Sequence, residues 1–249
     1  MSGDTDAPVD PTQPPRPTHT TRRVNALAAR IGARRYLEIG VQRGHTFRTV
    51  EIAERVGVDP RFLFDTEAVA DATTTLHAMT SDRFFAEAAG TKPFDIVFID
   101  GLHVFEQVVR DLTNTLAWTG WHSAILIDDV MPTDVYSSIP VQRDALRFRR
   151  EAGGRGGQWH GDVFKIAFLI HDFFPSLDYR TIVGTDNAQT LAWRAAGPMR
   201  KPIFNSLERI SRLTWFDLQA HMPILRGVSE EEAIELCAAA IAPRIATAR

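Results

Sequence analysis

Short apolar runs alternate with helical patterns along the middle of the chain. Residues 96–99 and 124–127 are continuous apolar runs rich in β-branched side chains, as in strands that are buried on both faces of a parallel sheet. Residues 104–116, between them, carry apolar side chains at helical spacing. The pattern predicts a right-handed β-α-β unit, whose two strands end at the same edge of the sheet.

Acidic residues follow both predicted strands. Asp100 comes directly after the first strand, and Asp128 and Asp129 come after the second. Ligands bind at the carboxyl edge of an open α/β sheet, so we expect the three carboxylates to converge on a binding site. Because no Lys or Arg lies beside them in sequence, their mutual repulsion predicts a cation between them. The alternative is that Asp128 and Asp129 cap the next segment or are solvated at a strand end.

A glycine turn precedes this unit. Residues 36–39 read as a strand, Gly40 and Gly44 lie in a turn, and residues 47–53 read as a helix with apolar residues three apart. Glycine lets a backbone approach a ligand closely, and a helix N-terminus offers unpaired N–H groups. The nicotinamide fingerprint G-x-G-x-x-G is absent, because its second and third glycines are missing.

An aspartate after the next predicted strand indicates a ribose-containing ligand. Asp59 lies nineteen residues beyond Gly40 (59 minus 40). An acid at this place in a doubly wound sheet accepts hydrogen bonds from ribose hydroxyls. The alternative is that Asp59 and the following proline form a plain turn.

Other segments predict further elements. Helices are expected over residues 22–31 and 84–88, strands over 76–79 and 163–170, and a closing strand pair over 179–195. The segment 143–157 combines five arginines with a glycine run and reads as mobile. Its arginines would form a solvated helix face, or else a lid that favours a substrate with a carboxylate or phosphate.

Together these elements predict a doubly wound, Rossmann-like α/β sheet with helices on both faces. The proline-rich residues 1–20 read as a disordered tail, and residues 21–197 as the folded domain. Residues 198–249 read as a helical C-terminal extension that would cap the substrate site or form a dimer contact. Within it, Ser229 and Glu232 fit a capping box at a helix start.

Composition excludes several functional classes. The net charge of −3 and the lack of a Lys/Arg tract argue against a nucleic-acid partner. The single cysteine, Cys237, excludes an internal disulfide framework and a cysteine zinc site. There is no apolar run long enough to cross a membrane and no signal-peptide pattern near Met1, so we expect a cytoplasmic protein.

Four motifs, LEIGVQRGHTF, VGVDP, FDIVFIDGLH and ILIDD, occur in this order and resemble class I S-adenosylmethionine-dependent methyltransferases. The resemblance covers about residues 22–195 and implies a sheet of seven strands. It also implies S-adenosyl-L-methionine as the cofactor, with Asp59 on the ribose and Asp82 near the adenine. The cofactor-binding residues that it implies are Glu38, Gly40, Gly44, Thr46, Asp59, Ser81, Asp82 and Asp100.

Within this class, the acid spacing is similar to that of magnesium-dependent O-methyltransferases. Asp128 and Asp129 follow Asp100 by 28 and 29 residues (128 minus 100 and 129 minus 100), and the Asp-Asp pair is most similar to the sugar-methylating, macrocin-type enzymes. The resemblance implies Mg²⁺ on Asp100, Asp128 and Asp129. Two departures stand out: D-G-L-H at residues 100–103 replaces the usual DGD, and T-G-W-H at residues 119–122 replaces the usual Pro-Gly-Gly.

The chemistry that follows is methyl transfer to oxygen. A hydroxyl needs a metal, a base or both to become a nucleophile at neutral pH. Magnesium would chelate neighbouring hydroxyls of a substrate and hold them in line with the methyl group. His103, three residues past Asp100, suits a general base, or is merely a locally bonded residue at a helix start. His160 and Asp162 would line the same pocket or form a turn, and Lys165 is expected at a strand end.

We therefore expect an S-adenosylmethionine-dependent O-methyltransferase, assisted by Mg²⁺, that acts on a sugar or another hydroxylated small molecule. Asp100 and His103 are its expected catalytic residues. One alternative is a metal-independent methyltransferase that uses His103 as its base. The other is a non-catalytic cofactor-binding protein of the same fold.

Overall fold

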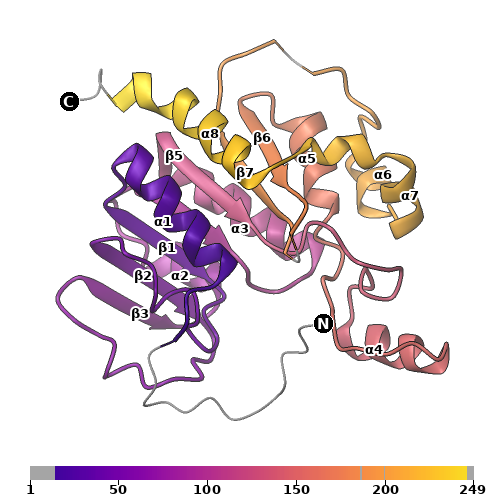
Figure 1. The fold of residues 1–249 in the computed structure, drawn as a ribbon, viewed down its shortest axis with the longest axis horizontal. Coiled ribbons are helices and arrows are strands. Elements are labelled where there is room, and N and C mark those ends of the chain that lie inside the picture. The colour runs from indigo at the N-terminus through magenta and orange to yellow at the C-terminus, as the bar shows by residue number, and fades with distance from the viewer. Residues whose placement is uncertain (1–14, 186, 199, 246–249) are drawn as a thin grey trace.

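An eight-stranded sheet organises the part of the chain that this computed structural model describes, residues 15–185, 187–198 and 200–245 (Figure 1). Its strand order is β3-β2-β1-β4-β5-β7-β6-β8. Strands β1 to β5 are parallel, and β7 runs antiparallel to both β5 and β6. The strands are β1 Arg35–Ile39, β2 Glu54–Asp59, β3 Thr74–Ala78, β4 Phe94–Ile99, β5 Thr119–Ile127, β6 Leu177–Ile182, β7 Gln189–Arg194 and β8 Gly227–Val228.

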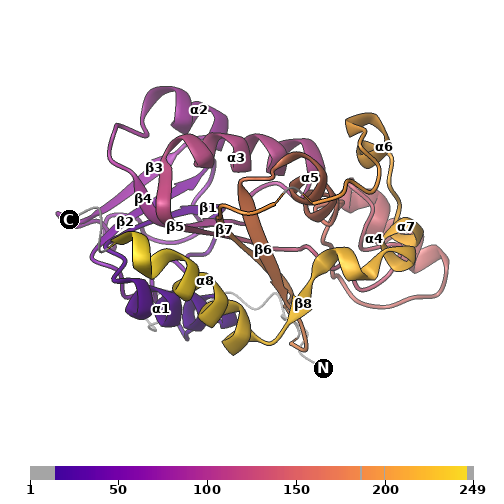
Figure 2. The same ribbon diagram turned by 90° about the horizontal axis from the view of Figure 1, so that it is seen from above.

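Helices cover both faces of the sheet. One face carries α1 and α8, and the other carries α2, α3 and α5 (Figures 1 and 2). The helices are α1 His19–Ile31, α2 Ser81–Glu87, α3 Phe105–Ala117, α4 Gln142–Glu151, α5 Lys165–Phe173, α6 Leu207–Ser211, α7 Trp215–Ala220 and α8 Glu230–Ile245, with a 3₁₀ turn at Met222–Leu225. The predicted doubly wound α/β architecture is confirmed.

The core has one cluster of apolar side chains on each face. In β4, Ile96 and Phe98 pack with α1 and α8, whereas Val97 and Ile99 pack with α3 and α5. This two-sided burial explains why the strand is a continuous apolar run in the sequence. The central β-α-β unit forms as predicted.

The predicted helix after Gly44 is wrong. Residues 45–49 form turns, and β2 begins at Glu54. The Thr49 hydroxyl donates a hydrogen bond to the His45 carbonyl (2.8 Å), an alternative to regular helix that threonine commonly offers. Phe47 and Val50 are still buried. The spacing of the apolar residues therefore reflects burial in the core and does not require a helix.

The predicted strand over residues 163–170 is also wrong, because α5 occupies this segment. All eight of its side chains are buried. A helix that is buried all round shows a continuous apolar run, which cannot be distinguished from a buried strand by periodicity alone. The closing strand pair is confirmed as β6 and β7.

The ends of the domain are part of the same fold. Within the segment from 198 onward, β8 pairs with β6, and α8 packs on α1 and the sheet. Thr18 caps α1, so residues 18–20 belong to the ordered domain, and residues 1–14 of the expected tail lie outside the described residues. In the described residues, no helix has the length and apolar content of a membrane span.

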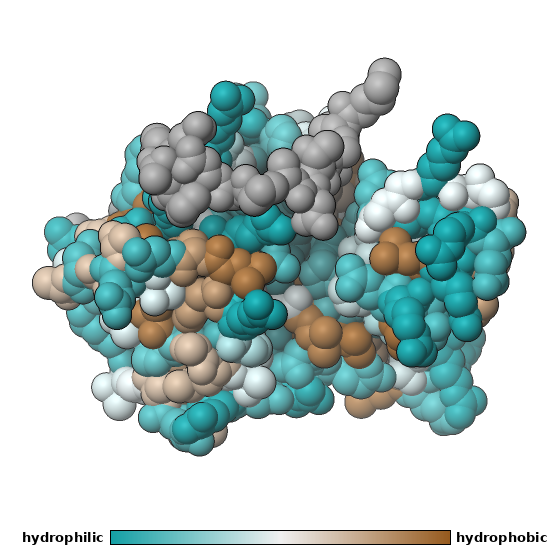
Figure 3. All heavy atoms as spheres, turned by 90° about the horizontal axis from the view of Figure 1, so that it is seen from below, coloured by the Kyte–Doolittle hydropathy of each residue, from teal (hydrophilic) through white to brown (hydrophobic). Residues whose placement is uncertain are grey.

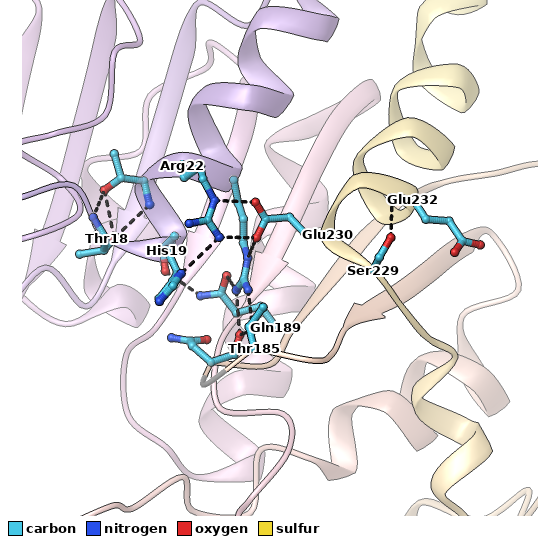
Figure 4. Close-up of polar contacts among 12 residues, drawn as sticks. Thr18, His19, Arg22, Thr185, Gln189, Ser229, Glu230 and Glu232 are labelled. Atoms are coloured by element: carbon cyan, nitrogen blue, oxygen red, sulfur yellow. Dashed lines mark hydrogen bonds and ion pairs between the residues drawn. The ribbon is translucent and has the colours of Figure 1, made fainter. Parts of the chain in front are cut away.

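An ion-pair group joins the starts of α1 and α8 (Figure 4). Arg22 donates to both carboxylate oxygens of Glu230 (2.7 and 2.8 Å). The buried Arg23 guanidinium adds a third bond to Glu230, at 3.0 Å. The hydrogen bonds from Arg22 are the main reason why the pKa of Glu230 falls from 4.5 to about 2.

We predict that Glu230→Gln lowers the free energy of unfolding by about 1–2 kcal/mol at pH 7, discounted for partial exposure. The folded-state pKa lies below the ordinary one. The stabilisation is therefore complete above pH 4.5 and disappears as the pH falls towards 2. Urea unfolding of both proteins across this range measures it. The exposed Glu231→Gln is the control, and a difference that does not change with pH would contradict the prediction.

Candidate active site

A cavity of about 700 Å³ opens where β1, β2, β3 and β4 end. Such a volume is typical of small-molecule sites. Seen from below, the surface of the molecule has a hollow with apolar residues on both of its sides (Figure 3). The predicted cofactor residues that line the cavity are Gly40, Asp59, Ser81, Asp82 and Asp100.

Gly40 shapes the first turn of the cavity. Its φ of +90° lies in the region that favours glycine, and a Cβ atom there would come within 1.9 Å of the Asp100 carbonyl oxygen. Gly40 N–H donates to Val58 (2.9 Å), and Asp100 N–H donates to Ile39 (2.8 Å). The ends of β1, β2 and β4 are thereby joined at the bottom of the site.

Asp59 lies in the cavity wall with a fixed carboxylate. One oxygen accepts the N–H of Gln42 (2.8 Å), and the other accepts the N–H of Arg61 (2.7 Å). Each oxygen retains capacity for another hydrogen bond, and a ribose diol could fill both.

Three predicted cofactor residues do not line the cavity. Glu38 is 2% exposed and accepts a hydrogen bond from the Tyr36 hydroxyl (2.7 Å). Burial raises the pKa of Glu38 well above its ordinary value, although the hydrogen bond from Tyr36 acts against this. The Thr46 hydroxyl bonds with that of Thr18 (3.0 Å), and Gly44 packs against Phe64. These residues support the turn from behind.

A second group of residues lies at the edge of this cavity, after β4 and β5. Ligand atoms of Asp100, His103 and Asp129 all lie within 4.8 Å of one another. His103 Nδ1 is 2.8 Å from an Asp129 oxygen, and its Nε2 is 3.5 Å from an Asp100 oxygen. Two of the three expected carboxylates, those of Asp100 and Asp129, lie in this group, and the imidazole of His103 lies between them.

The charges in this group follow from its geometry. Burial alone would lower the pKa of His103, but hydrogen bonds and charge from Asp100 and Asp129 outweigh it and raise this pKa to about 11. Burial, together with the charge of Asp129, raises the pKa of Asp100 to about 6. At neutral pH His103 is therefore an imidazolium and supplies the cation that the sequence analysis expected between the acids.

Asp128 lies outside this group of ligand atoms. One oxygen accepts the N–H of Asp129 (2.8 Å), and the other accepts hydrogen bonds from Gln189 (3.1 Å) and Asn187 (3.4 Å). Burial raises its pKa well above the ordinary value, and the charges of Asp100 and Asp129 add to this. In this geometry Asp128 attaches the end of β5 to the start of β7.

The segment 159–162 holds the loop of His103 in place, a contact that the sequence analysis missed. The Trp159 ring stacks on the imidazole of His103 at 4.7 Å between centroids. Gly161 packs so closely that a Cβ atom would lie 1.7 Å from the His103 carbonyl oxygen. Asp162 accepts the N–H of Phe105 (2.7 Å) and so caps α3, whose own N-cap residue has no side-chain bond.

The remaining residues that the sequence singled out have structural partners. Lys165 is buried in α5, where it bonds to Asp162 and the Ser211 carbonyl, each at 2.7 Å. It therefore does not lie at a strand end. His160 lies with its Nε2 4.0 Å from an Asp129 oxygen. Asp162 lies three residues before Lys165, whereas Ser211 and Asp129 lie far from their partners in the sequence, so no local pattern reveals those two contacts.

The arginines of α4 do not line the cavity. Arg143 and Arg147 lie beside Asp144 on an exposed face, as the solvated-helix interpretation predicts. Arg149 is different: it is buried, and it bonds to Asp134 (2.9 Å) and the Gln158 carbonyl (2.7 Å). It thereby attaches α4 to the segment that precedes Trp159.

Comparison with known families gives a match to part of the chain. Residues 37–130, from β1 through β5, match the family model described as a methyltransferase domain. This part of the chain is similar to such a domain. The match contains every residue that lines the cavity, which lie between Ile39 and Gln107. No curated protein sequence matches the chain.

Solved structures resemble this chain in fold at low sequence identity. A Staphylococcus aureus protein provisionally described as a caffeoyl-CoA O-methyltransferase has a TM-score of 0.50 and 12% identity, over 73% of this chain and 86% of its own. Cofactor-bound Rv0187 from MTB has a TM-score of 0.49 and 18% identity, over 72% of this chain and 80% of its own. The O-methyltransferase TomG from Streptomyces achromogenes, in complex with SAM, has a TM-score of 0.45 and 19% identity, over 72% of this chain and 81% of its own.

We predict that Asp59→Ala weakens the binding of S-adenosylhomocysteine by about 30-fold or more, because a charged acceptor for the ribose is lost. Isothermal titration calorimetry measures the affinity. Asp65→Ala is the matched control, because Asp65 bonds only to nearby loop N–H groups and lies outside the cavity. Equal affinities for the wild type and Asp59→Ala would contradict the assignment of Asp59 to the ribose.

Proposed function

We propose that the protein is an O-methyltransferase that transfers the methyl group of S-adenosylmethionine to a hydroxyl of a small molecule. The observation that carries the proposal is the Asp100–His103–Asp129 group next to the cavity that contains Asp59. Asp100 and His103 line the same cavity, so acid–base groups lie where the cofactor would end. The Staphylococcus aureus protein of similar fold is provisionally described as an O-methyltransferase, which agrees with oxygen as the acceptor.

The reaction requires orientation and the removal of one proton. The acceptor oxygen bonds to the methyl carbon as the carbon–sulfur bond breaks, and the hydroxyl proton leaves. Much of the rate of such a displacement comes from holding the two reactants in line. Asp59 and the turn at Gly40 would hold the cofactor, while the group around His103 would receive the acceptor.

His103 can accept the proton only after its pKa has fallen. With two carboxylates beside it, the imidazole is already protonated at neutral pH. A cation that binds against the same carboxylates, such as the sulfonium of the cofactor or a metal ion, lowers that pKa by repulsion. We infer that binding of the reactants turns His103 into the general base.

The donor set also fits a divalent metal ion. Asp100 and Asp129 offer carboxylate oxygens and His103 offers a ring nitrogen, all within 4.8 Å. Mg²⁺ prefers oxygen ligands, and the imidazole makes Mn²⁺ a second suitable ion. When bound, the ion would lower the pKa of the substrate hydroxyl. Adjacent hydroxyls of a sugar or a glycosylated metabolite are a natural chelating pair for such a site, and we favour that substrate class.

A metal-free reaction on the same residues is the second candidate, and the 2.8 Å contact between His103 and Asp129 favours it. A panel of hydroxylated small molecules, incubated with the cofactor and analysed for methyl ethers by mass spectrometry, separates the two. For the metal-assisted reaction, we predict that EDTA abolishes turnover and Mg²⁺ or Mn²⁺ restores it. Turnover that EDTA leaves unchanged would contradict the metal and favour His103 alone. If no methyl ether forms, a non-catalytic cofactor-binding protein becomes the better account.

We predict that His103→Ala lowers kcat by about 100-fold or more, the usual contribution of a general base, while S-adenosylhomocysteine still binds. Asp129→Asn should cost more activity than Asp128→Asn, because Asp129 contacts His103 and Asp128 bonds to Gln189 and Asn187 instead. Steady-state kinetics and calorimetry on the three variants test both statements. Comparable losses in the two aspartate variants would favour the ligand set expected from the sequence, which contains both residues, and the reverse order would contradict the role given to Asp129.

A further inference from the structure

Two buried side chains, Arg23 of α1 and Gln189 of β7, connect the start of α1 with Asp128. Arg23 is 2% exposed and Gln189 0%, and Gln189 lies next to the start of α1 (Figure 4). The register of the sheet pairs Ile127 of β5 with Thr190 of β7, so Asp128 and Gln189 occupy the next opposed positions. The sequence analysis singled out neither Arg23 nor Gln189, because no local pattern connects them with the acids.

The side-chain amide of Gln189 has only one orientation that satisfies its neighbours. Its oxygen accepts a hydrogen bond from Arg23 Nη1 at 2.6 Å, and a guanidinium offers donors only. Its nitrogen donates one hydrogen to Thr20 Oγ1 (2.7 Å) and the other to Asp128 Oδ2 (3.1 Å). If the amide turned over, its nitrogen would face the guanidinium, and Asp128 would lose a donor. Arg23 therefore fixes Gln189 as a donor to Asp128.

Arg23 is itself held from several sides. Its guanidinium donates to the Asn187 carbonyl (2.8 Å), to Thr185 Oγ1 (2.9 Å) and to Glu230 (3.0 Å). A buried guanidinium with these partners cannot turn away from Gln189 without leaving donors unpaired, which is costly in the interior. The orientation of Gln189 is thus set by α1, α8 and the segment before β7.

Asp128 and Asp129 are neighbours in sequence but face different partners. Asp128 is bonded on both carboxylate oxygens, one to the Asp129 N–H and the other to Gln189. Asp129 has a φ of +58°, in the left-handed region, and its carboxylate lies 2.8 Å from His103 Nδ1. The backbone of Asp128 nevertheless stays close to this group, because its N–H donates to the carbonyl of Ile99 (3.0 Å), the last residue of β4. Without the bond to Gln189, the Asp128 carboxylate could reach the same cation.

We infer that Gln189, oriented by Arg23, is a positioning residue that keeps Asp128 out of the cation site. It leaves Asp129 as the member of the pair that lies with His103. The Asp-Asp motif offers two candidate ligands, and the buried amide of β7 selects between them. The inference rests on the metal-assisted form of the proposed function, since it concerns the carboxylates that hold a divalent ion.

The experiment measures the affinity of the purified protein for Mn²⁺ alone, by isothermal titration calorimetry. Four proteins form a double-mutant cycle: the wild type, Asp128→Asn, Gln189→Met and the variant with both changes. In the wild type, we expect Asp128→Asn to weaken Mn²⁺ binding by only about 3-fold, the effect of a charge near the ion that is not bonded to it.

Gln189→Met keeps the length of the side chain but cannot donate a hydrogen bond, so it releases Asp128. It should tighten Mn²⁺ binding by about 10-fold, because a further carboxylate then joins the ion. In that background, Asp128→Asn should weaken Mn²⁺ binding by about 30-fold. The dependence of one effect on the other residue is the decisive readout, because a general loosening of the site would weaken Mn²⁺ binding rather than tighten it.

Thr20→Val is the matched control. It removes the acceptor of the other Gln189 hydrogen and leaves the bond to Asp128 in place, so the Mn²⁺ affinity should stay at the wild-type value. Circular dichroism shows that each variant is folded. If Gln189→Met does not fold, Gln189→Glu takes its place with the same expectation, because it keeps an acceptor for Arg23 and has no amide hydrogen for Asp128.

A loss of about 10-fold or more on Asp128→Asn in the wild type would overturn the inference, because Asp128 would then already be a ligand. The same small effect in both backgrounds would also overturn it, because Gln189 would then not be what holds Asp128 away. A wild type that binds S-adenosylhomocysteine but no Mn²⁺ would overturn the inference and leave the metal-free reaction. Failure to bind S-adenosylhomocysteine would overturn the proposed function, whereas the Mn²⁺ affinities would still decide the role of Gln189.

Discussion

The mutual repulsion of carboxylates at one edge of the sheet is the constraint on which the site depends. Parallel strands β4 and β5 both end in acid, so their topology alone brings Asp100, Asp128 and Asp129 together. The protein separates them in two ways. Asp128 is withdrawn towards β7 and is held by side-chain amides, and the imidazolium of His103 lies between Asp100 and Asp129.

The second feature of the site is the support behind His103. Trp159, Gly161 and Asp162 come from a segment between α4 and α5, and each contacts the loop that leads into α3. The buried pair of Lys165 and Asp162 extends this support to the carbonyl of Ser211 at the end of α6. The position of the imidazole therefore depends on elements outside the methyltransferase motifs. A catalytic group needs such support if it is to stay in line with its reactant.

The sequence predicted the parts of the fold that follow from local pattern. The strand ends at Asp59 and Asp100 could be predicted from the sequence, because in each case an apolar run stops at an acid. Both residues line the cavity. The segment 163–170 was misread as a strand, since complete burial in a helix and in a strand leaves the same apolar run. The turn after Gly44 was misread as a helix, because apolar spacing does not reveal that threonine hydroxyls bond to the backbone instead.

The same limit applies to the site residues. Which of Asp128 and Asp129 faces His103 depends on the backbone, and Asp129 has a φ of +58° that turns it towards the cavity side. No local pattern in the sequence specifies such a turn for an aspartate. Trp159 likewise contacts His103 only in the folded chain, because 56 residues separate the two (159 minus 103).

A crystal structure of the protein with S-adenosylhomocysteine tests the central claim most directly. We expect the ribose hydroxyls on Asp59, the base beside Ser81 and Asp82, and the sulfur atom facing Asp100, His103 and Asp129. A ligand bound elsewhere, or bound in this cavity with its sulfur turned away from His103, would contradict it.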